Sequence, residues 1–166
     1  MWPQAARGRQ VVEFMKSIRT LLITVAVLAG AGAAAPAAFG YIQITSPTGN
    51  IDCIIASSYG GSASCLVQKT SWARYPARPK SCDLDWARSQ VTLQKRKVVL
   101  GGCRGDIGPQ CIAGSAVKCR TLAYGKSATL GTIRCTSLTT GMMCRRTTGA
   151  TKPGFKVSKQ GYTLYR

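Results

Sequence analysis

The sequence predicts one small all-β domain that is cross-linked by disulfides. The 166-residue chain has eight cysteines and no histidine, and an even number of cysteines behind a secretory leader is typical of a disulfide framework. Short runs rich in β-branched and aromatic residues alternate with turn residues, and beyond the leader no run shows a helical apolar period. We therefore expect short antiparallel hairpins that form a sandwich or a partly open barrel.

The N-terminal part of the chain is predicted to be a secretory leader. Lys16 and Arg19 precede an apolar run at 21–28, and small residues then lead to an A-x-A pattern that ends at Ala37. This order of basic, apolar and small residues is that of a signal peptide. We assign residues 15–38 to an N-terminal signal helix.

The boundaries of the exported domain follow from this leader. Residues 1–14 lack the composition of a signal peptide and are interpreted as an over-extended start ahead of Met15. We assign residues 39–166 to the secreted, disulfide-rich β domain and expect cleavage near this boundary, after Ala37 or alternatively after Gly40. The competing interpretation is an N-terminal membrane anchor. It is disfavoured because glycine and proline interrupt an apolar run that is short for a membrane span.

Nine short runs in the exported domain are predicted to be strands. They lie at 41–44, 51–55, 64–68, 91–94, 97–100, 132–136, 142–145, 155–158 and 162–165. Glycine, proline and asparagine mark the turns between them. The segment 72–79 holds two prolines and two aromatic residues and is expected to cover the sheet. Only 83–88 could hold a helical turn.

The eight cysteines are predicted to form four disulfides. They are Cys53, Cys65, Cys82, Cys103, Cys111, Cys119, Cys135 and Cys144. The pairs 53–65 and 135–144 each bracket a predicted hairpin, whose facing positions bring Cα atoms within disulfide distance. The pair 111–119 encloses a short loop, which leaves 82–103 by elimination. No metal site is expected, because the closest cysteines are separated by seven residues and there is no histidine.

Basic residues dominate the exported domain. The chain has 23 Lys and Arg against 5 Asp and Glu, and beyond the leader 19 basic and four acidic residues leave a net charge of +15. Such a charge attracts polyanions, with a strength that salt reduces. The candidate anion-binding patch consists of Lys95, Lys97, Arg145 and Arg146.

The geometry of this patch is only partly predictable. In a strand, the two-residue period would place Lys95 and Lys97 on one outward face. Lys152, Lys156 and Lys159 would extend the patch if the C-terminal strands are its neighbours. The alternative is solubilising charge that is dispersed over the surface.

Signals for catalysis are weak. Without histidine, neither a Ser-His nor a Cys-His pair can form, and an oxidised cysteine is not a nucleophile. Asp83 and Asp85 would share one face of an extended segment, so a hydrolase that uses this carboxylate pair is the alternative function. Adjacent carboxylates more often cap a turn or pair with a nearby cation. We therefore favour a protein that is not an enzyme and expect no cofactor.

Several motifs occur along the exported domain in a fixed order. They are SPTGNIDC at 46–53, CDLDW at 82–86, CTSLTTGMMC at 135–144 and GFKVSKQGYTLY at 154–165. In this order they resemble an uncharacterised family of secreted domains that is common in actinobacteria, mycobacteria included. In the family pattern six cysteines recur, so Cys111 and Cys119 form an extra pair. Arg145 and Arg146 stand where members tend to have asparagine. The resemblance implies export, and it implies no activity or functional residue.

Together these observations favour a secreted, monomeric binding module at the cell envelope or outside the cell. Its partner is expected to be an anionic envelope polymer, an anionic lipid or a protein. Nucleic acid is not expected, because the chain is exported and shows no helix suited to reading a groove.

Overall fold

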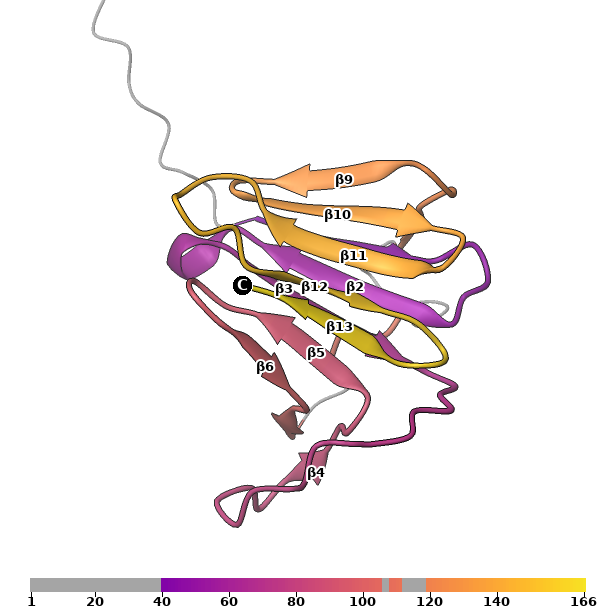
Figure 1. Cartoon of the computed structure of the whole chain (residues 1–166), viewed down its shortest axis with the longest axis vertical. Coiled ribbons are helices and arrows are strands. Elements are labelled where there is room, and N and C mark those ends of the chain that lie inside the picture. Colours follow the sequence, from indigo (N-terminus) through magenta and orange to yellow (C-terminus); the bar gives the residue numbers. More distant parts are fainter. Residues whose placement is uncertain (1–39, 106–107, 112–118) are drawn as a thin grey trace, which may run out of the picture. The chain divides into compact units, whose positions relative to one another are not determined.

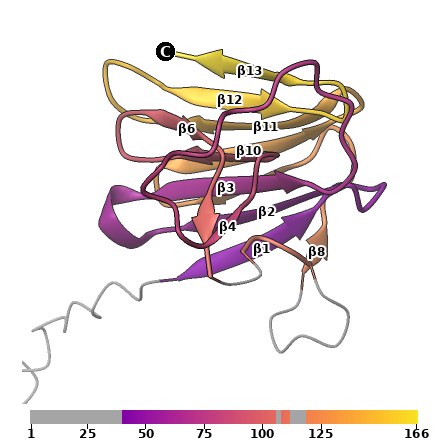
Figure 2. The ribbon, with the colours of Figure 1, turned by 90° about the horizontal axis from the view of Figure 1, so that it is seen from below.

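Two β-sheets packed face to face form the body of the protein in the computed structural model (Figures 1 and 2). The structure describes residues 40–105, 108–111 and 119–166. The predicted leader and the over-extended start, residues 1–38, lie outside this range. Among the described residues, no helix has the length and apolar character needed to cross a membrane.

The first sheet has six strands. Its order is β6 (Val98–Leu100), β5 (Gln90–Leu93), β3 (Ser62–Val67), β2 (Ile51–Ala56), β1 (Tyr41–Thr45) and β8 (Arg120–Thr121). Neighbouring strands are antiparallel except for β1 and β8, which run parallel. A short 3₁₀ turn, η1 (Ser58–Gly60), joins β2 to β3.

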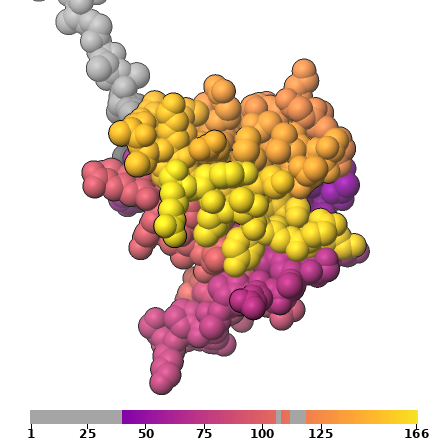
Figure 3. All heavy atoms as spheres, in the orientation of Figure 1, coloured from indigo at the N-terminus to yellow at the C-terminus, as the bar shows by residue number. Residues whose placement is uncertain are grey.

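The second sheet has five strands that follow one another in sequence. Its order is β13 (Tyr162–Tyr165), β12 (Gly154–Val157), β11 (Gly141–Arg146), β10 (Ile133–Leu138) and β9 (Ser127–Leu130). All its neighbours are antiparallel. This meander, orange to yellow, makes most of the face turned to the viewer in Figure 3.

The strand prediction is correct in outline, and the differences lie in short elements. A third sheet pairs β4 (Asp85–Trp86) with β7 (Cys103–Arg104). The expected helical turn at 83–88 is therefore wrong, because backbone pairing with β7 extends this segment. Four strands were not predicted from the sequence: β4, β7, β8 and β9. Three of these have only two residues, which is too short for an alternating pattern to be recognised.

The core lies between the two large sheets. Alternate residues point inward: Ile133 and Cys135 of β10 are fully buried and Arg134 between them is exposed. From the facing sheet, Ile44, Ile55 and Leu93 are also fully buried. This alternation is the one expected for a sheet with one face on the core and the other in water.

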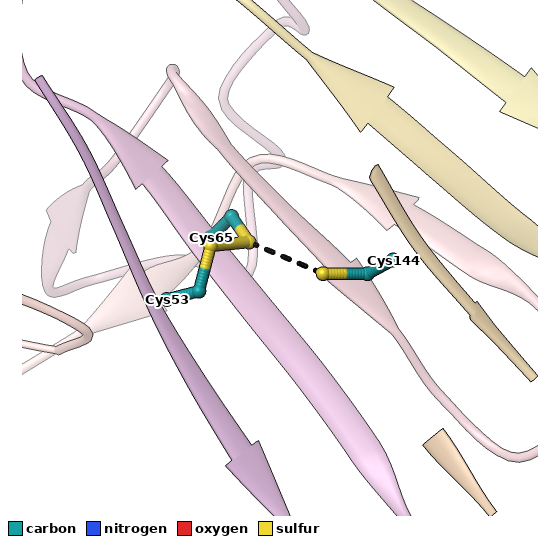
Figure 4. A group of neighbouring side chains, drawn as sticks. All are labelled: Cys53, Cys65 and Cys144. Carbon is teal, nitrogen blue, oxygen red and sulfur yellow. Dashed lines mark hydrogen bonds between the residues drawn. A yellow bond between two sulfur atoms is a disulfide. The ribbon is translucent and has the colours of Figure 1, made fainter. Parts of the chain in front are cut away.

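Four disulfides close the domain. They join Cys53 to Cys65, Cys82 to Cys103, Cys111 to Cys119 and Cys135 to Cys144, as the spacing predicts. The pairs 53–65 and 135–144 link directly opposite residues of β2–β3 and β10–β11. The two pairs meet across the core, where the Sγ atoms of Cys65 and Cys144 lie 3.7 Å apart; Figure 4 shows Cys144 facing the Cys53–Cys65 disulfide.

The segment after β3 covers one end of the core, as its prolines and aromatic residues predict. Trp72 is only 5% exposed, and its Nε1 donates to the carbonyl of Ser158 at 2.9 Å. Its ring stacks on Tyr75 and meets Tyr162 edge-on. The segment after β3 therefore joins the first sheet to the turn between β12 and β13.

Candidate functional site

The predicted anion patch lies at one end of the sandwich, which we call the basic end. Here β2 turns into β3, β5 into β6, β9 into β10 and β11 into β12. In Figure 1 it is the end that carries η1. Lys95, Lys97, Arg145 and Arg146 all belong to these turns or to the strand residues next to them.

Three further cations lie at the basic end: Arg96, Lys152, and Arg134, which is exposed near the start of β10 opposite Arg145. Arg96 lies between Lys95 and Lys97, and Lys152 follows β11 in the turn to β12. The turns and the adjoining strand ends, residues 56–62, 93–98, 130–134 and 145–154, contain no Asp or Glu. A surface that carries cations without carboxylates attracts anions more strongly than a mixed surface does.

Lys95, Arg96 and Lys97 are all exposed in the tight turn between β5 and β6. The turn is closed by a hydrogen bond from the amide of Gln94 to the carbonyl of Lys97, 2.8 Å long. The expected common strand face of Lys95 and Lys97 is not present, because β5 ends at Leu93 and β6 begins at Val98. The turn itself exposes the three side chains.

Arg145 is exposed, and its guanidinium carbon lies 4.8 Å from the centroid of the Tyr165 ring. Its Nη2 also donates to the carbonyl of Lys152 at 3.3 Å. The guanidinium lies over the ring in a cation–π contact, which holds an arginine without neutralising its charge. Arg145 is therefore an ordered cation of the basic end.

Arg146 differs from the other three predicted residues because its side chain is directed into the structure. Its Nη1 donates to the carbonyl of Gly60 at 2.9 Å and to Thr132 Oγ1 at 2.6 Å. Its Nη2 donates to the carbonyl of Gly61 at 3.1 Å. The guanidinium thus joins β11 of one sheet to the β2–β3 turn of the other, so Arg146 positions the basic end rather than offering its donors to a ligand.

The turn held by Arg146 displays Tyr59, a residue that the sequence does not single out. Tyr59 is 96% exposed and has a φ of 51° in the left-handed region. That conformation is rare for a bulky residue, and such strain persists where the surroundings impose it. The side chain of Lys95 lies next to the same turn, at Gly60. An exposed aromatic ring therefore stands among the cations.

Asp83 and Asp85, the carboxylates of the alternative function, lie in and just before β4, which belongs to the small third sheet. Both are exposed, and Asp85 stands directly opposite Arg104 in the β4–β7 pair. A carboxylate-pair hydrolase needs two groups that face each other across a substrate. Neither Asp83 nor Asp85 lines the groove that lies between the turns at the other end of the sandwich.

The sulfur atoms of Cys53, Cys65 and Cys144 lie within 4.8 Å of one another. This spacing would suit a thiolate metal site, but all three sulfurs belong to disulfides, Cys53 with Cys65 (Figure 4) and Cys144 with Cys135. A disulfide sulfur carries no thiolate charge with which to bind a cation. The cluster is a packing contact at the centre of the core.

These features define a small disulfide-linked β-sandwich with a strongly basic end. Its four disulfides fit an extracellular or secreted protein. The chain belongs to a family of unknown function, DUF6636, whose model matches residues 21–165. No curated protein and no solved structure matches the chain.

Proposed function

We propose that this protein is a secreted binding module whose basic end associates with an anionic polymer of the cell envelope. The observation that carries the proposal is the gathering of Lys95, Arg96, Lys97, Arg145 and Lys152 at one end of the sandwich, in turns that contain no Asp or Glu. A repeating polyanion can contact several of these cations at once. Their summed attraction then exceeds that of any single exposed pair.

The rigidity of the basic end supports the same function. Arg146 fixes the β2–β3 turn, and the disulfides fix the hairpins behind it. A preordered surface loses less conformational entropy when it binds. The exposed ring of Tyr59 adds a surface on which a sugar or a similarly flat group can stack.

Export precedes this function. Residues 15–38 act as a cleaved signal peptide in our proposal, and the product acts as a monomer outside the cytoplasm. N-terminal sequencing of the exported protein tests the cleavage, which is expected after Ala37 or Gly40. An N-terminus that retains Met15 would contradict it.

The binding test compares sulfated dextran with neutral dextran, using the oxidised exported domain over a range of salt. We expect binding to the sulfated polymer only, weakening as salt rises. The variant carries Lys95→Gln, Lys97→Gln and Arg145→Gln. Its affinity at low salt should fall roughly tenfold or more.

The matched control removes three exposed cations elsewhere, with Arg74→Gln, Lys80→Gln and Lys126→Gln. It has the same net charge as the variant, so it separates a local patch from dispersed charge. Equal losses in the two proteins would contradict a basic-end site. Binding to anionic phosphatidylglycerol vesicles in place of the polymer would show that lipid is the ligand.

A further inference from the structure

A groove lies at the end of the sandwich opposite the basic end, and we call it the groove end. Its volume is about 520 Å³, within the range of about 300–1,000 Å³ that small-molecule sites occupy. It forms where the turns β1–β2, β10–β11 and β12–β13 meet the residues that follow β3 and Tyr124 of the segment between β8 and β9. Both sheets therefore contribute to its walls.

The backbone of the groove is held in place by hydrogen bonds. The side chain of Asn50 accepts from the amide of Lys69 at 2.8 Å and donates to its carbonyl at 3.1 Å. The carbonyl of Lys159 accepts from the amide of Ser71 at 2.8 Å. These contacts fix the chain at both lysines, so the groove is formed before any ligand enters.

Several polar side chains of the groove are not used by the fold. Among the described residues, the hydroxyls of Thr139 and Thr140 and the side-chain amide of Gln160 have no hydrogen-bond partner, and all three residues are exposed. Tyr124 adds a ring that is 45% exposed. Hydroxyls and an amide beside an aromatic ring suit a sugar, which has polar edges and a C–H face.

The charge of the groove selects among sugars. Lys69 and Lys159 line it, and its lining residues include no Asp or Glu. Two ammonium groups without a carboxylate favour an anionic ligand. Because lysine binds as a point charge, the pair can accept a carboxylate or a phosphate.

We propose that the groove binds an acidic sugar, either a uronic acid or a sugar phosphate. Lys69 and Lys159 hold the anionic group, Thr139, Thr140 and Gln160 bond the hydroxyls, and Tyr124 packs against the ring. This site is separate from the basic end, because the two lie at opposite ends of β2, β3, β10 and β11. The protein would then hold a polymer at one end and recognise a sugar unit at the other.

The test is an NMR titration of the oxidised exported domain with glucuronate, glucose 6-phosphate, glucose and inorganic phosphate. We expect saturable shifts at residues 46–51, 139–141 and 158–160 with both acidic sugars. Glucose should bind more weakly, since it lacks the anion. Phosphate should bind more weakly too, since it lacks the hydroxyls and the ring.

Variants separate the contributions of charge and hydroxyl groups. The pair Lys69→Gln and Lys159→Gln should weaken glucuronate binding roughly tenfold, as should Thr139→Val with Thr140→Val. The basic-end variant Lys97→Gln with Arg145→Gln is the matched control and should bind glucuronate unchanged.

Three outcomes would overturn the inference. The first is the absence of saturable shifts with either acidic sugar. The second is phosphate binding as tightly as glucose 6-phosphate, which would indicate a simple anion site. The third is shifts confined to residues 58–61, 94–97 and 145–152, which would place the sugar at the basic end. The first two results do not bear on whether the basic end binds the sulfated polymer, so the two proposals can fail separately.

Discussion

The two ends of the sandwich are built from the same strands but expose different chemistry. At the basic end the turns display cations and the Tyr59 ring. At the groove end the turns border an open groove that is lined by hydroxyls, amides and two lysines. In a meander, successive turns fall alternately at the two ends, so residues close in sequence are divided between them.

The C-terminal hairpins illustrate this division. Lys152 precedes β12 and lies at the basic end, whereas Lys159 follows β12 and lines the groove. Lys156 lies between them within the strand and belongs to neither end. Three lysines that read as one cluster in the sequence therefore occupy three different environments. A binding surface in this fold has to be assigned turn by turn.

The largest loss of stability is expected from a change in the core, which both ends of the sandwich share. Replacing Cys135 and Cys144 together, by Cys135→Ala and Cys144→Ala, should lower the free energy of unfolding by about 2–5 kcal/mol. Both residues are fully buried where the sheets meet. Urea unfolding measures the loss, and binding should weaken at both ends.

The control for this prediction is the pair Cys111→Ala and Cys119→Ala, which removes a disulfide of half-buried residues outside the strands of the two large sheets. This control should lower the free energy of unfolding by less than the loss of the Cys135–Cys144 disulfide does. If both pairs of substitutions lower the free energy of unfolding equally, the buried position of the Cys135–Cys144 disulfide adds nothing to its stabilising effect.

The next effect is confined to the basic end. Arg146→Met should lower the free energy of unfolding by about 2 kcal/mol, because it leaves the carbonyls of Gly60 and Gly61 without their charged donor. Hydrogen exchange at Gly60 and Gly61 should become faster. Binding of sulfated dextran should weaken, and binding of glucuronate should not change.

Arg145→Met is the matched control, since it removes the same charge from an exposed site. Its cost in stability should be about 0.5 kcal/mol or less. If the two variants show the same hydrogen exchange at Gly60 and Gly61 and the same free energy of unfolding, the hydrogen bonds of Arg146 do not hold the β2–β3 turn.

The smallest effect is confined to the groove end. Trp72→Phe removes the hydrogen bond from Nε1 to the carbonyl of Ser158, and the loss of that bond alone costs about 1 kcal/mol. The turn that carries Lys159 should loosen, and glucuronate affinity should fall severalfold. Calorimetric titration measures the affinity.

Trp86→Phe provides the comparison, because it removes a similar hydrogen bond from Nε1 to the carbonyl of Pro76. Trp86 does not line the groove. A loss of glucuronate affinity equal to that of Trp72→Phe would mean that the groove responds to global stability rather than to its own wall.

The sequence predicts the strands and disulfides because both depend on local patterns. Alternation identifies the inward positions of β10, and hairpin spacing pairs Cys135 with Cys144. The role of Arg146 also has a local signal. It follows Met142 and Cys144 at intervals of two, so it shares their inward face. The same alternation places its neighbour Arg145 on the outward face of β11.

Other features depend on contacts between distant segments. The pairing of β8 with β1 brings Arg120 opposite Ile44 across 76 positions of sequence, and no local pattern indicates it. The groove combines residues from five separate segments, each an ordinary polar turn when considered alone. The display of Tyr59 depends on hydrogen bonds from Arg146. Such features become visible only when the turns are placed in space.

The contact between Cys65 and Cys144 has a consequence for oxidative folding. Their sulfurs are close enough that a misplaced bond could join the two sheets directly. The native partners are separated by only 12 and 9 positions, whereas Cys65 and Cys144 are 79 apart. Because closing a short loop costs less entropy, the hairpin bonds are favoured before the sheets meet. The order in which the chain collapses thus selects the correct isomer among neighbouring sulfurs.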